Sequence, residues 1–223
     1  MIDRPSPNFG PRPTGAKIDM IVLHYTGMKS ADDALARMCD PTSEVSAHFM
    51  IDEDGAVFRL VAEGMRAWHA GVSSWAGAVD INDRSIGIEM VNPGHKFGYR
   101  PFPEPQMAAL ESLARDLISR YEVPAHRVLG HADVAPARKS DPGELFDWRR
   151  LAQLGIGVWS DEDAGRVQVD PVQLLGRYGY EIDGSNPTPA VIAFQRHFRP
   201  SRVDGFADAE TVARLGDLCA RFT

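Results

Sequence analysis

Hydrophobic and polar positions along the first part of the chain follow two different periods, which predict both strands and helices. Residues 17–27 contain a short apolar run that ends at a glycine, a pattern typical of a buried strand. Residues 30–40 begin with Ser30 as a candidate N-cap and repeat apolar side chains about once per helical turn, which predicts a helix. Residues 47–61 hold two β-rich runs around an Asp-Gly pair at 54–55, which predicts a hairpin.

The middle of the chain continues this alternation. In residues 85–92 every second side chain is isoleucine or methionine, so the segment reads as a strand with Glu89 on its opposite face. Residues 104–123 carry an apolar stripe at helical spacing. Strands that alternate with helices predict an α/β fold, in which a mixed central β-sheet is flanked by helices.

The composition changes after residue 155, which suggests a second unit. We expect a first domain over residues 1–155, a linker over 156–169 and a small helical domain over 170–223. Its three short helices are predicted over residues 171–180, 188–198 and 208–222. A unit of about fifty residues is near the lower limit for independent folding, so its core should be tight.

Composition and charge exclude several classes of protein. The net charge of −7 comes without a basic stripe, which argues against a nucleic-acid partner. No segment approaches the run of about 20 apolar residues that spans a membrane. The first residues have no apolar signal core, which predicts a cytoplasmic protein, or a periplasmic or envelope protein if a leader was removed. The distant Cys39 and Cys219 are expected to be thiols, and the oligomeric state stays open.

Residues 130–143 gather charged and metal-capable side chains in a stretch that two prolines keep irregular. Such a loop is either a solvated surface or a functional site. Hydrolytic zinc enzymes typically use three His, Asp or Glu ligands and leave a fourth position for water. His24, at the end of a predicted strand, could join His131 and either Asp133 or Asp141. Spacing alone does not choose, and His24 could equally be a histidine hydrogen-bonded at a strand end.

Five ordered motifs give the chain a family resemblance. They are "VLHYTG" (22–27), "SAHFMID" (46–52), "RAWHAGVSSW" (66–75), "SIGIEMVNPG" (85–94) and "GHADVAPARKSDPG" (130–143). In this order and at these separations, the chain resembles the zinc-dependent N-acetylmuramoyl-L-alanine amidases of the type-2 amidase family, which are related to peptidoglycan recognition proteins. The resemblance covers residues from about 17 to 155 and implies a zinc ion at the bottom of a groove.

The resemblance implies a role for each matched site residue. The family's zinc ligands fall on His24, His131 and Asp141, its catalytic carboxylate on Glu89 and its transition-state cation on Lys139. A carboxylate close to the metal can take a proton from the attacking water and pass it to the leaving amine. An ammonium group beside the carbonyl oxygen can stabilise the oxyanion.

Other polar residues take supporting roles in this interpretation. Trp68 and His69 are expected to line the substrate groove, with the indole face against a sugar ring and the imidazole near the peptide. Asp133 becomes a turn residue or a neighbour of the ligands, and His48 is expected to be mainly structural. Arg138 has no assigned role.

The implied reaction is hydrolysis of the amide between N-acetylmuramic acid, or its anhydro form, and the L-alanine of the stem peptide. Intact peptidoglycan and soluble muropeptides both remain candidate substrates. Residues 178–215 resemble the three-helix peptidoglycan-binding domain of cell-wall hydrolases, although this copy could simply pack against the amidase domain. The alternative function is a non-catalytic peptidoglycan-recognition module, which would have lost a metal ligand.

Overall fold

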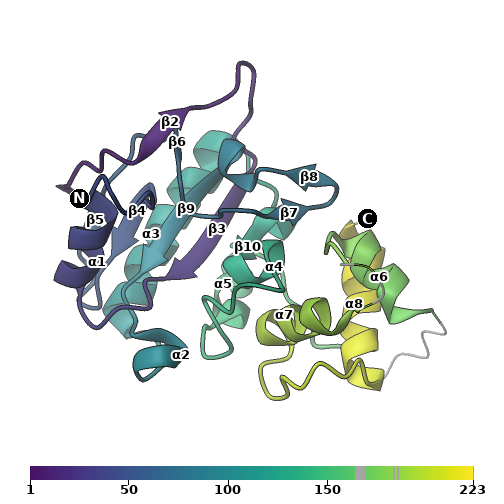
Figure 1. The fold of residues 1–223 in the computed structure, drawn as a ribbon. Coiled ribbons are helices and arrows are strands. Elements are labelled where there is room, and N and C mark those ends of the chain that lie inside the picture. Colours follow the sequence, from purple (N-terminus) through teal and green to yellow (C-terminus); the bar gives the residue numbers. More distant parts are fainter. Residues whose placement is uncertain (164–168, 183, 185, 223) are drawn as a thin grey trace.

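A mixed β-sheet lies at the centre of the computed structural model (Figure 1). The structure describes residues 1–163, 169–182, 184 and 186–222. Within this part of the chain the sheet has six strands, in the order β1-β5-β4-β9-β3-β10. Strands β4, β9, β3 and β10 are parallel, and β5 pairs antiparallel with β4 and parallel with β1. The strands are β1 Ile2–Asp3, β3 Met20–Tyr25, β4 Phe49–Ile51, β5 Val57–Arg59, β9 Ser85–Met90 and β10 Val128–Gly130.

Smaller strand pairs and the helices complete the described fold. The paired short strands are β2 Phe9–Pro11 with β6 Met65–Ala67, and β7 Ser74–Trp75 with β8 Ala78–Val79. The helices are α1 Ala31–Cys39, α2 Gly94–Phe97, α3 Glu104–Tyr121, α4 His131–Val134, α5 Trp148–Gln153, α6 Pro171–Tyr178, α7 Thr188–Phe198 and α8 Ala209–Phe222, with short 3-10 turns at η1 Ile81–Asp83 and η2 Ala125–Arg127. Among the described residues no helix combines the length and the apolar character needed to cross a bilayer. A mixed sheet flanked by helices confirms the predicted fold class.

The two faces of the central strands pack against different helices. Along β3, Ile21 and Leu23 join a core with residues of α3 and α5. Their neighbours Met20 and Val22 point to the other face, into a core that includes residues of α4, α6, α7 and α8. Because side chains alternate along a strand, His24 follows Met20 and Val22 and lies on the face of the C-terminal helices.

The C-terminal helices therefore share a core with the amidase-like sheet. Leu174 of α6, Phe194 of α7 and Leu218 of α8 are all buried in the same cluster as Val22. Within the expected linker, Ile156 and Val158 are 1% and 8% exposed, and they pack into the cores on opposite faces of the sheet. Residues 164–168 of that expected linker lie outside the described residues.

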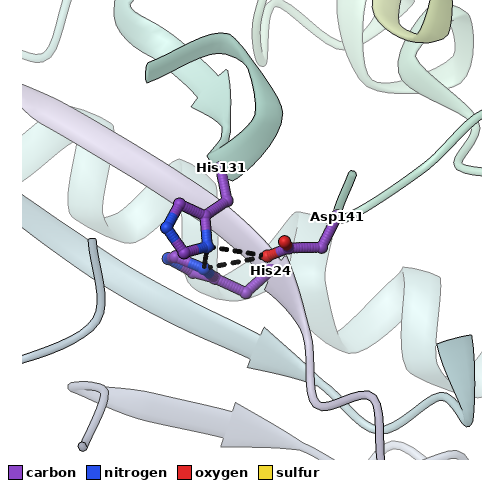
Figure 2. Close-up of side chains that lie close together, drawn as sticks. All are labelled: His24, His131 and Asp141. Carbon is purple, nitrogen blue, oxygen red and sulfur yellow. Dashed lines mark hydrogen bonds and ion pairs between the residues drawn. The ribbon is translucent and has the colours of Figure 1, made fainter. Parts of the chain in front are cut away.

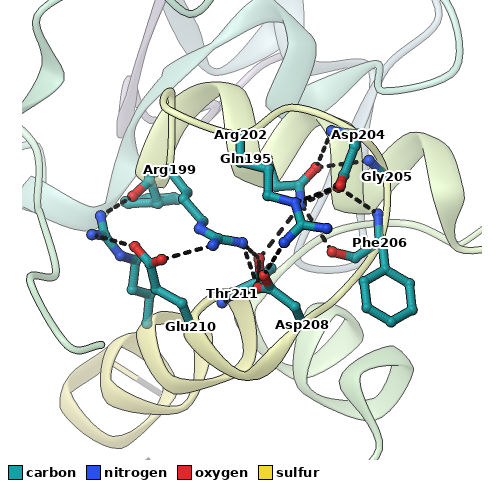
Figure 3. A network of polar contacts seen from close by, with 11 residues as sticks. Gln195, Arg199, Arg202, Asp204, Gly205, Phe206, Asp208, Glu210 and Thr211 are labelled. Atoms are coloured by element: carbon teal, nitrogen blue, oxygen red, sulfur yellow. Dashed lines mark hydrogen bonds and ion pairs between the residues drawn. The ribbon is translucent and has the colours of Figure 1, made fainter. Parts of the chain in front are cut away.

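A polar network joins the end of α7 to the start of α8 (Figure 3). The Gln195 side chain accepts hydrogen bonds from the backbone N–H groups of Asp204 (3.0 Å) and Gly205 (2.8 Å), and donates to the Phe206 carbonyl (3.0 Å). Arg199 forms ion pairs with acidic side chains at the start of α8. Gln195 thus holds closed the turn between α7 and α8.

Candidate metal centre and active-site cavity

Three adjacent parallel strands bring the predicted site residues to one edge of the sheet. In the register of β3 and β9, His24 lies beside Glu89. In the register of β10 and β3, Gly130 lies beside Leu23, so His131 follows at the level of His24. Ligands of open α/β sheets bind outside the carboxyl ends of the strands, and this is the edge where these side chains meet.

The side chains of His24, His131 and Asp141 converge on one point (Figure 2). The Nδ1 atoms of the two histidines are 2.9 Å apart, and Asp141 Oδ2 lies 3.1 Å from His24 Nδ1 and 3.0 Å from His131 Nδ1. All three residues are buried. In the described part of the chain this is the group of His, Cys, Asp or Glu side chains whose geometry could hold a metal ion.

In each candidate histidine ligand, the Nε2 atom, which faces away from Asp141, has its own hydrogen-bond acceptor. His131 Nε2 lies 3.1 Å from the Ala70 carbonyl, which can only accept, so His131 carries its proton on Nε2. His24 Nε2 lies 3.0 Å from His69 Nδ1. His69 Nε2 in turn faces Ser85 Oγ at 3.1 Å, and the Ser85 hydroxyl donates to the Ile81 carbonyl at 2.7 Å.

This chain of hydrogen bonds fixes the proton on His24. Because the Ser85 hydroxyl gives its proton to a carbonyl, its oxygen accepts from His69 Nε2–H, and His69 Nδ1 then accepts from His24 Nε2–H. Both candidate ligands thus present an Nδ1 lone pair toward the Asp141 carboxylate. Two lone pairs and an anion that face one point fit a bound cation, and partners on the outer nitrogen are what orient histidine ligands in metal sites.

His69 can lie against the strand because Gly87 has no side chain. A Cβ atom at Gly87 would collide with the imidazole ring of His69. The backbone N–H groups of His69 and Ala70 both donate to Asn82 Oδ1, at 3.1 and 2.8 Å. The segment is therefore fixed on both sides, with both ring nitrogens of His69 occupied by His24 and Ser85.

Burial and mutual charge act on the titration of the centre. Burial and then the neighbouring His131 lower the pKa of His24 to about 4, while Asp141 opposes the change. Burial would raise the pKa of the Asp141 carboxyl, but the contacts with His131 and His24 hold it well below its usual range. Asp141 is thus an anion beside the His24 imidazole, whose lowered pKa favours the neutral form that metal binding requires.

A cavity with a volume of about 330 Å³ lies at the candidate metal centre. Glu89 and Lys139 line it together with His131 and Asp141. Glu89 Oε2 is buried and has no hydrogen-bond partner among the described residues. Burial and then the Asp141 charge raise the pKa of Glu89 to about 8, against an opposing effect of Lys139. A carboxyl group with this pKa can exchange a proton near neutral pH.

Trp68, His69 and Arg138 also line this cavity. Trp68 is partly exposed, and its ring is available as part of the cavity wall. Arg138, which had no assigned role, donates hydrogen bonds to the carbonyls of Ala70 (3.2 Å) and Val72. It thereby ties the irregular loop to the segment that supports both histidines.

Asp133 and His48 lie outside the cavity lining. Asp133 is 1% exposed and directs its carboxylate away from the centre, toward the Gly130 N–H at 2.7 Å. His48 is completely buried and accepts a hydrogen bond from the Gly87 N–H at 3.0 Å, which ties it to the strand beside it. Ala70 and Ser85 lie within the motifs at 66–75 and 85–94, but neither was predicted to support a histidine.

Two imidazoles and a carboxylate that converge beside an unpartnered glutamate, at the carboxyl edge of a parallel sheet, are typical of a hydrolase that uses a metal ion. Residues 14–144 match the family described as N-acetylmuramoyl-L-alanine amidase, Amidase_2. The chain belongs to this N-acetylmuramoyl-L-alanine amidase family.

Individual relatives extend the similarity over most of the chain. The N-acetylmuramoyl-L-alanine amidase AmiD of Escherichia coli K12 is 41% identical, over 92% of this chain and 84% of the relative. A structure of E. coli AmiD in complex with the substrate anhydro-N-acetylmuramic acid-L-Ala-D-gamma-Glu-L-Lys has a TM-score of 0.83 and 37% identity, covering 95% of this chain and 93% of that chain. AmpDh3 of Pseudomonas aeruginosa in complex with anhydromuramic pentapeptide also has a TM-score of 0.83, with 34% identity and 94% coverage of both chains.

Proposed function

We propose that this amidase uses a zinc ion held by His24, His131 and Asp141 to hydrolyse the amide between anhydro-N-acetylmuramic acid and L-alanine in soluble muropeptides. The observation that carries the proposal is the convergence of two Nδ1 atoms and Asp141 Oδ2 within about 3 Å of one another, in the cavity that also holds Glu89 and Lys139. The substrate class is supported by the muropeptides bound in the structures of the E. coli and P. aeruginosa relatives.

The donor set favours zinc among divalent ions. Imidazole nitrogens suit zinc, whereas sites for magnesium and calcium are built from oxygen atoms. A zinc ion with three protein ligands supplies a Lewis acid and lowers the pKa of water at its open position to about 7. The protein contributes the orientation of its ligands, through the Ala70 carbonyl behind His131 and through His69 behind His24.

Glu89 is proposed to move the proton. Its carboxylate would accept a proton from the attacking water and deliver it to the nitrogen of the departing L-alanine. The buried Oε2 without a partner leaves the group available for this transfer, and a pKa raised to about 8 suits both directions of it. Zinc in the site would lower that pKa, because a nearby cation favours the charged carboxylate.

Lys139 and Trp68 are proposed to hold the substrate in two different ways. The Lys139 ammonium group would face the carbonyl oxygen and stabilise the negative charge that develops on it. Trp68 offers a ring at the cavity wall, against which the muramic acid ring could pack. His69 is proposed to act on His24 rather than on the peptide, because both of its ring nitrogens are already bonded.

A non-catalytic recognition module is the alternative function. Such a module keeps a groove but has no need for a complete metal centre or for a free carboxylate. Here the three candidate ligands converge, and Glu89 and Lys139 line the same cavity as His131 and Asp141. These features favour the enzyme.

The test is a comparison of substrates with and without metal. Zinc-loaded and chelator-stripped protein are incubated with soluble anhydro-muropeptides and, separately, with purified sacculi, and the products are identified by mass spectrometry. We expect free stem peptide from the anhydro-muropeptides only when zinc is present. Release from sacculi alone would correct the substrate, and release from neither would end the amidase proposal.

A further inference from the structure

One buried carboxylate, that of Asp133, joins the C-terminal helical unit to the short helix that begins with a candidate metal ligand. Asp133 belongs to α4, the short helix that begins with the candidate ligand His131. Its Oδ1 accepts a hydrogen bond from the Tyr180 hydroxyl at 2.6 Å, and its Oδ2 lies 2.7 Å from His197 Nδ1. Tyr180 follows α6 and His197 lies in α7, so both donors come from the C-terminal unit.

These groups are enclosed on all sides. Tyr180 and His197 are each 3% exposed. The His197 ring stacks between Trp148 and Phe198, with centroid distances of 3.7 and 3.9 Å. Hydrogen bonds to a charged acceptor in such a dry place are stronger and better defined in geometry than those at a surface.

Asp133 connects these two donors to the backbone around the candidate ligands His131 and Asp141. Its Oδ2 also accepts from the backbone N–H of Gly130, the residue directly before His131. The next residue, Ala132, donates its backbone N–H to the carbonyl of Asp141 at 2.9 Å. The C-terminal unit therefore holds α4 through the side chain of Asp133. In turn, α4 holds the backbone of Asp141 through the N–H group of Ala132.

We infer that the C-terminal unit is a positioning element of the metal centre, in which Tyr180 and His197 fix His131 and Asp141 through Asp133. The inference rests on the metal site of the proposed function. It assigns Asp133 a role beyond the turn, and it gives the helical unit a task in the amidase domain itself, whether or not that unit also contacts cell wall. The apolar contacts support it, since Ala132 and Val134 of α4 pack in the same core as Phe194.

The chain offers a matched pair of tyrosines for the test. Tyr180→Phe removes the hydroxyl that bonds to Asp133. Tyr178→Phe is the control, because Tyr178 is also buried but its hydroxyl has no hydrogen-bond partner among the described residues. Zinc affinity of each full-length variant is measured by competition with a chelator, at a temperature where circular dichroism shows the metal-free protein folded.

We expect Tyr180→Phe to weaken zinc binding by up to about 10-fold, at or below the lower end of the 10- to 100-fold effect of losing a partner bonded directly to a metal ligand, because Tyr180 acts through Asp133. Tyr178→Phe should bind zinc like the natural chain. A second pair probes the other donor: His197→Leu should weaken zinc binding, whereas His197→Asn, which keeps an N–H near the position of Nδ1, should restore part of the affinity. If His197→Leu does not fold, the tyrosine pair still decides.

The outcomes separate this inference from the proposed function. Unchanged zinc affinity in Tyr180→Phe and His197→Leu, even with a lower melting temperature, would show that the unit only packs and would overturn the inference. If the natural chain binds zinc and Tyr180→Phe weakens that binding, but the natural chain releases no stem peptide, only the proposed reaction is overturned. A natural chain that binds no zinc would overturn both.

Discussion

Two clusters of polar side chains in this molecule are built differently: the candidate metal centre of His24, His131 and Asp141, and the network that joins α7 to α8 (Figures 2 and 3). In the network, the Arg199 guanidinium faces the carboxylates of Asp208 and Glu210. At the metal centre the Asp141 carboxylate faces two imidazoles, and no Lys or Arg side chain bonds to it among the described residues.

The difference shows how a structural cluster and a functional cluster can be told apart. In the network, opposite charges of the chain itself are paired, so the arrangement stabilises the helical unit without a ligand. At the centre, a buried anion and two lone pairs converge with no cation from the chain, so the arrangement is complete only when one is added. Changes at the centre should therefore affect function more than folding, and changes in the network the reverse.

The largest effect is expected from Asp141→Ala. This variant removes the anion of the centre, so zinc content should fall and release of stem peptide should drop by at least about a thousandfold, because metal catalysis supplies several kcal/mol. Zinc is measured by elemental analysis and stem peptide by mass spectrometry. If the variant kept full zinc content and full activity, the cluster of His24, His131 and Asp141 would not be the functional one.

Glu89→Gln should come next. The amide keeps the size of the side chain but cannot transfer the proton, so kcat should fall by about 10² to 10⁴ while zinc content stays at that of the natural chain. Steady-state kinetics and zinc content are measured on the same preparation. Loss of zinc together with activity would instead place Glu89 among the groups that hold the metal.

Asp208→Ala probes the network with the same kind of truncation as Asp141→Ala. Asp208 accepts from Arg199 and, at 3.0 Å, from the backbone N–H of Thr211 in the first turn of α8. Loss of this cap and ion pair should lower the free energy of unfolding by about 2 kcal/mol, measured by urea titration. Asp208→Asn, which can still cap the helix, should lose less, and kcat of folded Asp208→Ala should be unchanged.

The smallest effect is expected from His48→Gln, and it depends on pH. Burial and then the Arg12 charge lower the pKa of His48 to about 3. His48 therefore takes up a proton near pH 6.5 in the unfolded chain but only near pH 3 in the folded chain. The free energy of unfolding decreases as pH falls through this window, because the unfolded chain binds more protons. His48→Gln should remove up to about 1.4 kcal/mol per pH unit from that slope. Urea titrations at pH 7, 6 and 5 test it, and identical slopes would contradict it.

The strands of the site could be predicted because the relevant information is local. The period of two in residues 85–92 placed Glu89 opposite the apolar face, and β9 carries it to the cavity. The choice between Asp133 and Asp141 could not be made from spacing, because both lie in one irregular loop. It depends on where each carboxylate turns, and Asp133 turns to donors from the C-terminal unit.

The supporting contacts could not be predicted because they join distant segments. The bond between His24 and His69 spans 45 residues, and those of Asp133 to Tyr180 and His197 span 47 and 64 residues. Tyr180 and His197 lie in segments whose pattern predicts only a helical core. The "WHAG" motif indicated that His69 matters, but its partners Ser85 and His24 follow from the approach of the strands.

The position of Asp133 has a consequence for the order of events during synthesis. A ribosome delivers His24 first and His131 and Asp141 next, and all three candidate ligands are made before residue 180. The two outer donors to Asp133 do not exist until Tyr180 and His197 have been added. A nascent chain therefore has its three candidate ligands before it has the two donors to Asp133. If these residues bind zinc as proposed, zinc captured during translation should be bound more loosely than zinc in the finished chain.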